Sequence, residues 1–358
     1  MKQYKGMIFC MMAALIFAGC GHADSPAGDG DSAGHNKDFS VSVAEGQSLW
    51  WDYTSVSEVP ELPGARIAIV AKDMDLDYWE AVREGAELAV DEINEKFGFT
   101  GDDEIVLTME GSGDGADVEA QVNQIDTVLA ENPTALCIAA VDVESCAPQL
   151  EAAADNRIPV IALESGVENP LLTAACETDN YAAAQRAVQE LCNAIGDSGE
   201  IALVTHSAAS QTAKERLSGF LWEISAHPDI KVAANLVQNE TDSIETMVNA
   251  ALELHPDLKG IFCTNEQTAV ETLQTLEKLG REDLTVVGFD AGKVQREAVE
   301  AGREYGLICQ NPRGMGYVSV VAAVHAAAGE KIDKYIDTGY CWIDQNNIDE
   351  AGSAVYLY

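Results

Sequence analysis

The chain has 358 residues, which is long enough for two domains with a hydrophobic core each. Acidic residues outnumber basic ones by 60 to 21, so the formal net charge is -39 at pH 7. A surface this acidic repels phosphate backbones, which argues against nucleic acid as a partner.

The first twenty residues have the features of an export signal. After a short basic start, the apolar run from Met7 to Ala18 is too short to span a bilayer as a helix. Phe17-Ala18-Gly19-Cys20 resembles the lipobox of bacterial lipoproteins, although Phe17 stands where that motif prefers Leu. The resemblance implies that residues 1–20 are a signal peptide and that Cys20 carries a lipid. The protein is then anchored to the cell membrane on its extracytoplasmic face.

Residues 21–63 are predicted to form a tether and an N-terminal extension. From His22 to Asp38 the chain is rich in Gly, Ser, Asp and Ala and has almost nothing to bury. The extension then carries Trp50, Trp51 and Tyr53, which are costly to expose to water. We expect these three side chains to pack on the main body rather than to bind ligand.

Strands and helices alternate from Arg66 onward. The apolar patterns predict strands at residues 66–71, 104–109, 135–140 and 158–163, and helices at 78–96, 117–130 and 144–156. Strict alternation of this kind is typical of a doubly wound parallel sheet.

A second series of the same kind follows. Helices are predicted at residues 180–194, 211–226, 243–254 and 315–328, and strands at 200–205, 231–237, 260–264, 284–289 and 305–310. The two series predict two similar α/β lobes. Because no Pro-rich or Ser-rich linker separates them, we expect the chain to cross between the lobes several times.

The stretch from Lys259 to Gly292 indicates where a ligand would bind. It contains two strands and a helix that stops at Gly280, so the strands are expected to be parallel. Asn265 and Asp290 each follow a strand directly, and open parallel sheets bind ligands beyond the carboxyl ends of their strands. Asn265 has a second interpretation as the N-cap of the helix, and both interpretations remain open.

Four segments resemble the ribose-type periplasmic sugar-binding proteins of ABC importers. They are IPVIALESG (158–166), KERLSGF (214–220), HPDLKGIFCTNEQTAVETLQTLEKLG (255–280) and LTVVGFDAG (284–292). The resemblance implies the type I periplasmic binding protein fold, an α/β fold of two doubly wound parallel-sheet lobes joined by three crossings. By analogy the crossings lie near residues 176–178, 310–312 and 338–340. The N-terminal lobe is then 64–177 plus 311–338, and the C-terminal lobe 178–310 plus 339–358.

The resemblance also implies a ligand site between the lobes. Its expected members are Tyr78, Trp79, Glu164, Ser165, Arg216, Asn265, Asp290 and Gln310. Sugars have apolar faces and a rim of hydroxyls, so aromatic rings and planar polar groups suit them. Structural alternatives are a core position for Trp79, a surface ion pair for Arg216 and a simple strand end for Gln310.

Two departures from the ribose-type pattern bear on the ligand. Glu164-Ser165 replaces an Asp-Arg pair, which leaves Arg216 as the one expected cation of the site. We therefore expect a ligand other than ribose, and we hypothesise an amino sugar or another polyol with positive charge. An aromatic residue expected near Thr241 is absent, which weakens stacking from the second lobe.

The cysteines give no sign of a metal or redox site. Nine are present, and seven remain beyond Cys10 and Cys20 of the leader, an odd number that cannot all pair within one chain. No CxxC pair or His cluster occurs. The residues from Asp73 to Glu84 are spaced like a calcium loop, but Tyr78 occupies the position that needs Gly. We expect no metal and no cofactor.

The resemblance implies a monomeric, lipid-anchored solute-binding protein that captures a small polar ligand, a sugar, and hands it to an ABC permease. One alternative is a ligand-sensing protein of the same fold that signals to a membrane kinase or chemoreceptor. A secreted α/β hydrolase is a remote alternative, because the predicted lobes lack a nucleophile elbow. On the main interpretation the protein is not an enzyme.

Overall fold

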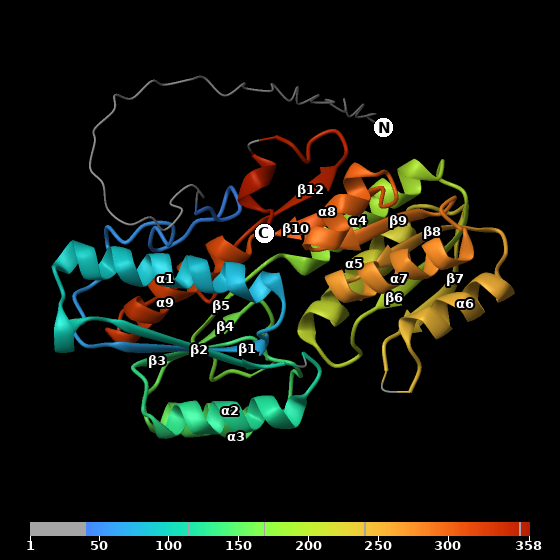
Figure 1. Cartoon of the computed structure of the whole chain (residues 1–358). Coiled ribbons are helices and arrows are strands. Elements are labelled where there is room, and N and C mark those ends of the chain that lie inside the picture. Colours follow the sequence, from blue (N-terminus) through green and yellow to red (C-terminus); the bar gives the residue numbers. More distant parts are fainter. Residues whose placement is uncertain (1–40, 114, 168, 240, 351) are drawn as a thin grey trace, which may run out of the picture. The chain divides into compact units, whose positions relative to one another are not determined.

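A computed structural model describes residues 41–113, 115–167, 169–239, 241–350 and 352–358 (Figure 1). The N-terminal lobe contains a six-stranded sheet in the order β11-β5-β4-β3-β1-β2, in which all neighbouring strands are parallel. Its strands are β1 (Arg66–Asp73), β2 (Val106–Ser112), β3 (Ala135–Ile138), β4 (Val160–Leu163), β5 (Ala174–Glu177) and β11 (Tyr335–Asp337).

Helices cover both faces of this sheet (Figure 1). The helices are α1 (Asp77–Phe97) and α9 (Pro312–Ala327) on one face, and α2 (Val118–Ala130) and α3 (Ala147–Asp155) on the other. Successive strand residues alternate between the faces, so Ile67 and Ile69 pack towards α1 and α9, whereas Ala68 and Val70 pack towards α2 and α3. The short 3-10 helix η1 (Gly101–Asp103) follows α1.

Two glycines allow α1 and α9 to pack backbone to backbone. A Cβ at Gly85 would lie 1.8 Å from the carbonyl oxygen of Arg313, and a Cβ at Gly316 would lie 2.0 Å from that of Val82. Only glycine fits at such distances. This contact fixes the first turns of α1, on which two predicted site residues lie.

The C-terminal lobe repeats the arrangement. Its six-stranded sheet has the order β12-β10-β9-β8-β6-β7, and only β12 is antiparallel to its neighbour. The strands are β6 (Gly199–Thr205), β7 (Ile230–Val237), β8 (Leu258–Cys263), β9 (Thr285–Phe289), β10 (Gly306–Gln310) and β12 (Tyr340–Asp344).

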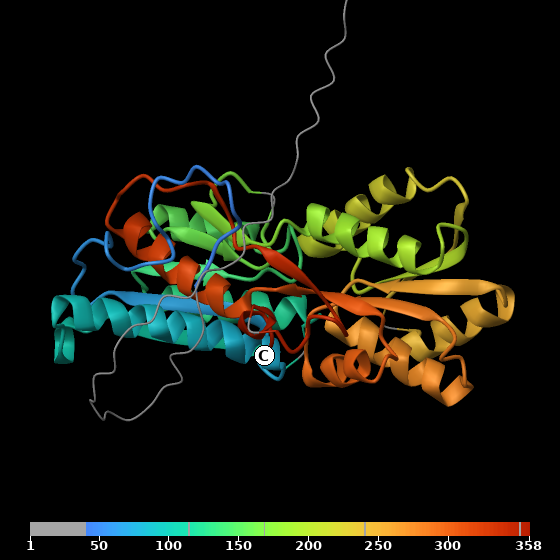
Figure 2. The same cartoon turned by 90° about the horizontal axis from the view of Figure 1, so that it is seen from above.

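Helices cover the two faces of this second sheet as well, as Figure 2 shows from above. They are α4 (Asn180–Ala194) and α5 (Gln211–Ile224) on one face, and α6 (Ile244–Leu254), α7 (Glu266–Leu279) and α8 (Lys293–Glu300) on the other. The 3-10 helix η2 (Ser353–Val355) follows β12.

The chain passes between the two sheets three times in the described residues. It does so after β5 ends at Glu177, after β10 ends at Gln310, and between β11 and β12 through Thr338 and Gly339. Two doubly wound parallel-sheet lobes with three crossings confirm the predicted fold class.

The N-terminal extension packs on the N-terminal lobe. The Tyr53 side chain is fully buried and its hydroxyl bonds to Asp333 at 3.0 Å, and Trp51 stacks on His325 with ring centroids 4.6 Å apart. Both residues therefore pack on the main body, as predicted, whereas Trp50 remains 58% exposed. The predicted signal peptide, Cys20 and the tether lie outside the described residues. Among the described helices, none is both long and apolar enough to cross a membrane.

Candidate functional site

Asp290 lies directly after β9 in a left-handed backbone conformation, with φ at +74°. Its N–H donates to the Ile308 carbonyl at 2.7 Å. Its Oδ1 accepts from the Gln310 amide at 2.7 Å, and its Oδ2 accepts from the Glu266 N–H at 3.1 Å. Burial raises the pKa of Asp290, and the nearby Arg216 guanidinium opposes this shift. Both carboxylate oxygens are thus held in fixed positions at the end of the sheet.

Asn265 is the N-cap of α7, which confirms that interpretation. Its Oδ1 accepts from the Thr268 N–H at 3.0 Å, and the Thr268 hydroxyl oxygen in turn accepts from the Asn265 N–H at 3.2 Å. This capping box satisfies two of the donors at the start of the helix. Because the cap engages Oδ1, Nδ2 is the amide atom that can face a ligand.

Arg216, on α5, is only 1% exposed. Its Nε donates to Asn180 Oδ1 at 2.9 Å and its Nη1 to the Thr264 carbonyl at 2.6 Å. The guanidinium lies 3.8 Å from the centre of the Phe289 ring. These contacts fix the plane of the guanidinium and leave Nη2 buried without a partner among the described residues. The alternative of a surface ion pair is therefore wrong.

The N-terminal lobe contributes Glu164 and Ser165 directly after β4. Glu164 also has a left-handed backbone, with φ at +65°, and strained positions of this kind gather at functional sites. Its Oε2 lies 2.6 Å from the Nζ of Lys72, and both side chains are largely buried. Ser165 is fully buried, and its hydroxyl has no partner among the described residues.

Lys72 was missed by the sequence analysis, and it changes the charge of the site. The expectation that Arg216 is the one cation facing the site carboxylates is wrong, because Lys72 pairs with Glu164. The sequence does contain a signal for it, since Lys72 follows the apolar residues of β1 near the carboxyl end of that strand. A lysine at the end of a buried strand is costly unless an acid meets it.

Tyr78 and Trp79 lie in the first turn of α1 and are buried. Their rings pack edge to face with centroids 5.2 Å apart. Both belong to the hydrophobic core of the N-terminal lobe, so the core position foreseen for Trp79 is confirmed. Burial raises the pKa of Tyr78, and the carboxylates of Glu164 and Asp290 raise it further. Tyr78 is thus close to site residues of both lobes.

Buried polar atoms without hydrogen-bond partners occur across the described residues, and several of them lie at this site. Among the described residues they include Ser165 Oγ, Thr205 Oγ1, Arg216 Nη2 and Gln310 Oε1. Each lies at or beyond the carboxyl end of a strand, except Arg216, which reaches the end of β8 from α5. A buried polar group without a partner costs about 1–3 kcal/mol, so a bound molecule rich in hydroxyls would relieve several such costs at once.

His206 and Ser210 lie close together but do not form a catalytic pair. The Ser210 hydroxyl is 3.3 Å from His206 Nε2, but it also accepts from the Ala213 N–H as the N-cap of α5. The other ring nitrogen of His206 contacts the Thr264 hydroxyl at 2.8 Å, so no carboxylate orients the imidazole. Burial lowers the pKa of His206 well below its usual range, and the Arg216 charge lowers it further. The ring is therefore neutral.

No group of three or more His, Cys, Asp or Glu side chains is placed to hold a metal ion within the part of the chain that the structure describes. Glu84, which the calcium-loop spacing would have used, instead pairs with Arg313 at 2.7 Å.

Residues 67–331 match the family described as "Periplasmic binding protein domain". The chain belongs to this family. It is an extracytoplasmic family of binding proteins rather than of enzymes.

Two curated relatives are named for xylitol and for ribose. The xylitol-binding protein of Mycolicibacterium smegmatis is 27% identical over 239 residues, which are 66% of this chain and 68% of that protein. The ribose import binding protein of Salmonella typhimurium is 24% identical over 271 residues, which are 74% and 86% of the two chains.

Two solved structures of ABC transporter solute-binding proteins from Agrobacterium vitis have the same fold. The first, with bound D-fucose, is 25% identical with a TM-score of 0.73 and covers 82% of this chain and 100% of its own. The second, with bound α-D-tagatopyranose, is 25% identical with a TM-score of 0.75 and covers 82% and 99%. The predicted family is confirmed.

Proposed function

We propose that this protein is a lipid-anchored solute-binding protein that captures a sugar or polyol between its lobes and delivers it to an ABC importer. The observation that carries the proposal is the set of buried, unpartnered polar atoms at strand ends of both lobes. Ser165 comes from one lobe, and Arg216 and Gln310 come from the other. A molecule with several hydroxyls meets such atoms from both sides, and its binding then favours a closed arrangement of the lobes.

The charges near the site favour a neutral ligand. Two carboxylates, Glu164 and Asp290, are offset by two cations, Lys72 and Arg216. A third acid, Glu266, lies beside Asp290, and burial raises its pKa to about 7, so a ligand amine would meet little uncompensated negative charge. We propose a neutral sugar or polyol in place of the amino sugar hypothesised from the sequence.

The individual contacts follow from what each group can donate or accept. Arg216 Nη2 donates to a ligand oxygen, Gln310 Oε1 accepts from a ligand hydroxyl, and Asn265 Nδ2 donates to another. Tyr78 offers an apolar surface for a CH face of the sugar. Because a buried donor or acceptor left unpaired is costly, this pattern rejects sugars with a hydroxyl in the wrong place.

A thermal shift screen of the chain without its leader tests the proposal. The panel contains ribose, arabinose, D-fucose, tagatose, xylitol and glucosamine. A nucleoside and an amino acid serve as negative controls. A ligand at 100 times its Kd should stabilise the folded state by roughly 2.7 kcal/mol, which raises Tm by several degrees. A shift with a neutral sugar or polyol supports the proposal. No shift with any sugar contradicts it, and a shift with glucosamine alone contradicts the neutral ligand.

The lipid anchor and the importer need separate experiments. The full chain expressed in a bacterium with labelled palmitate should incorporate the label, and Cys20→Ser should abolish incorporation. Deletion of the gene should abolish uptake of the sugar found in the screen. Uptake that persists while a sugar response disappears would favour the sensing alternative.

A further inference from the structure

The chain continues beyond β12 as an ordered C-terminal segment, defined here as the described residues between 345 and 358. Ser353 Oγ donates to the Asn347 carbonyl at 2.7 Å, and the Tyr356 N–H donates to the Ser353 carbonyl at 2.9 Å. Asn347 Oδ1 also accepts from the Asp344 N–H at 2.8 Å, which ties the segment to the last strand. These bonds direct the segment across the C-terminal lobe towards the candidate site.

Tyr358, in the C-terminal segment, contacts both lobes. Its ring packs edge to face against Tyr78 with centroids 5.6 Å apart and planes at 85°. Its hydroxyl oxygen accepts from the Ala291 N–H at 3.1 Å. The side chain packs against the hydrophobic core of the N-terminal lobe and against a core cluster of the C-terminal lobe that includes Ala291.

The residue before Tyr358 is tied to the N-terminal lobe. The Leu357 carbonyl accepts from Arg313 Nη1 at 2.7 Å, and Arg313 Nε bonds to Glu84 at 2.7 Å. Arg313 lies on α9 and Glu84 on α1, the helix that begins with Tyr78. The segment thus starts on one lobe and is bound to the other at its far end.

Tyr358 contacts one predicted ligand residue directly, in the N-terminal lobe, and in the C-terminal lobe it contacts the neighbour of another. Tyr78 is one of the two aromatic residues predicted for the N-terminal half, and Ala291 follows Asp290, whose backbone is left-handed. The Glu266 N–H holds Asp290 Oδ2, and Glu266 is the residue after the N-cap of α7. Tyr358 therefore restrains the ring of Tyr78 and the backbone that follows Asp290.

The hydroxyl of Tyr358 remains protonated. Burial raises its pKa well above the usual range, and the carboxylates of Asp290 and Glu266 raise it further. A protonated hydroxyl can accept from the Ala291 N–H and keep its own proton. The aromatic residue that the family resemblance implies near Thr241 is absent from the sequence, and Thr241 itself is exposed. The ring of Tyr358, from the C-terminal segment, instead packs against Tyr78.

We propose that Tyr358 is a positioning residue of the ligand site, which braces Tyr78 and the Asp290–Ala291 backbone and links the two lobes non-covalently. The proposal rests on the proposed function. Separation of the lobes breaks either the contact with Tyr78 or the bond to Ala291, so Tyr358 favours the arrangement in which both halves face the same ligand. Its loss therefore speeds ligand dissociation and lets the unliganded protein open further.

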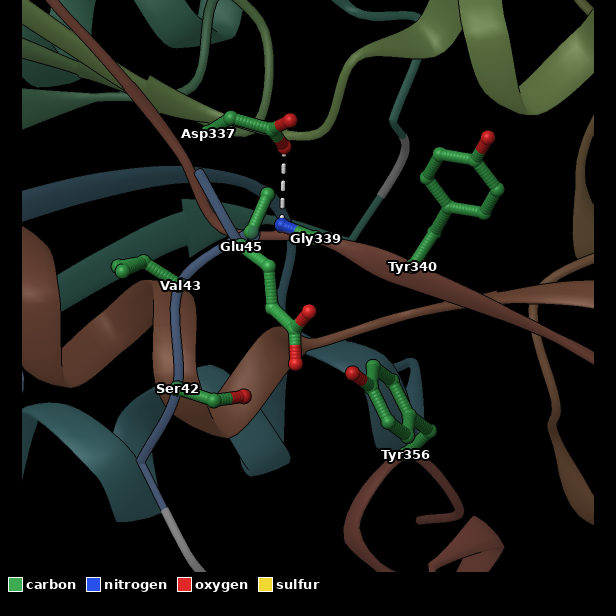
Figure 3. Close-up of a pocket in the computed structure, with 8 residues that line it drawn as sticks. Ser42, Val43, Glu45, Asp337, Gly339, Tyr340 and Tyr356 are labelled. Carbon is green, nitrogen blue, oxygen red and sulfur yellow. Dashed lines mark hydrogen bonds between the residues drawn. The ribbon is translucent and has the colours of Figure 1, made fainter. Parts of the chain in front are cut away.

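Tyr356 provides a matched control in the same segment. It lines a groove of about 350 Å³ with residues of the N-terminal extension and of the crossing between β11 and β12 (Figure 3). Ser42, Glu45 and Asp337 are among these residues. Like Tyr358, Tyr356 packs against the core cluster of the C-terminal lobe, but among the described residues the ring of Tyr78 packs against the rings of Trp79 and Tyr358 and not against that of Tyr356. If the contacts of Tyr358 position the ligand site, Tyr358→Phe should weaken sugar binding and Tyr356→Phe should leave it unchanged.

The experiment compares wild type, Tyr358→Phe, Tyr358→Ala and Tyr356→Phe, each as the chain without its leader. Affinity and dissociation rate are measured with the best sugar of the panel by calorimetry and stopped flow. Tyr358→Phe keeps the ring and should weaken binding about 3- to 10-fold, the effect of losing neutral hydrogen bonds. Tyr358→Ala should weaken it about 10- to 100-fold through faster dissociation, and Tyr356→Phe should stay within about twofold.

Small-angle scattering of the unliganded proteins separates positioning from simple loss of structure. Tyr358→Ala should have a larger radius of gyration than wild type while circular dichroism shows that it remains folded at the temperature of measurement. Wild-type affinity and dimensions in Tyr358→Ala, or equal loss of binding in Tyr356→Phe, would overturn the proposal. If no sugar shifts wild type, the proposed function fails, and scattering of the unliganded variants still decides whether Tyr358 links the lobes.

Discussion

Replacement of Asp290 by Asn tests the centre of the candidate site with little change in volume. Each carboxylate oxygen of Asp290 accepts an N–H donor, from Gln310 at 2.7 Å and from Glu266 at 3.1 Å. An amide has one acceptor oxygen, so its NH₂ group must face one of the two donors. Asn tolerates the left-handed backbone that Asp290 adopts at φ +74°, so the loop itself should persist.

The size of the effect follows from the bonds that are lost. A hydrogen bond to a charged group contributes about 1.5–3 kcal/mol, and about 1.4 kcal/mol corresponds to a tenfold change in affinity. Asp290→Asn should therefore weaken sugar binding about 10- to 150-fold, as measured by isothermal titration calorimetry. Because burial raises the pKa of Asp290, acidification should weaken wild-type binding at a higher pH than an exposed aspartate would allow. The Asn variant should lack this dependence.

Asp197→Asn is the matched control. Asp197 also has a left-handed backbone, with φ at +51°, but it is exposed and bonds to His227. It should bind sugar like wild type. Binding by Asp290→Asn within about threefold of wild type would refute the reasoning, provided that urea denaturation shows the variant to be folded.

The other predictions concern stability and reactivity. Lys72→Met leaves the Glu164 carboxylate buried without its cation and should lower the free energy of unfolding in urea by about 3 kcal/mol, part of which a second change, Glu164→Gln, should restore. Burial raises the pKa of Glu304 to about 8, above that of an unfolded glutamate near roughly 4.3, so the folded state holds the extra proton between these values. Stability should therefore fall as pH rises through this window, with Glu304 contributing up to about 1.4 kcal/mol per pH unit, and Glu304→Gln should reduce the slope by this contribution and be more stable than wild type at pH 8. Of the seven free cysteines in the described residues, only Cys341 is not fully buried, so a thiol reagent should label at most one group quickly in the native protein and all seven after unfolding.

Each of these predictions has a contradicting outcome. Unchanged stability of Lys72→Met would mean that the buried ion pair contributes nothing. A pH slope that is as steep in Glu304→Gln as in wild type would assign the whole proton uptake to other buried acids, such as Glu177, whose pKa burial also raises to about 8. Rapid labelling of several thiols would show that the lobes open far more than the packing allows.

The sequence alone determined most of the regular structure, because buried strands and amphipathic helices have strong local patterns. The helix from Asn180 to Ala194 was predicted with the bounds that it has, and α1 and β6 within one residue at each end. The missed elements are β5, β11, β12 and α8. Two of these strands have four residues or fewer, and β12 is an antiparallel edge strand, so they show little periodicity.

The sequence also located residues that directly follow the carboxyl ends of strands, such as Glu164 and Asp290, because the end of a strand can be recognised from the local sequence. It did not reveal their partners. Lys72 and Glu164 are 92 residues apart and meet because the order of strands places β1 and β4 on either side of β3.

Tyr358 is the clearest case of what only the tertiary structure decided. Its own neighbours in sequence give no hint of a role, and it reaches Tyr78 and Ala291 because the C-terminal segment packs across both lobes. Local pattern specifies which elements form and which faces are buried. The contacts between distant residues depend on the order of strands and on the packing of lobes, which no local stretch of sequence contains.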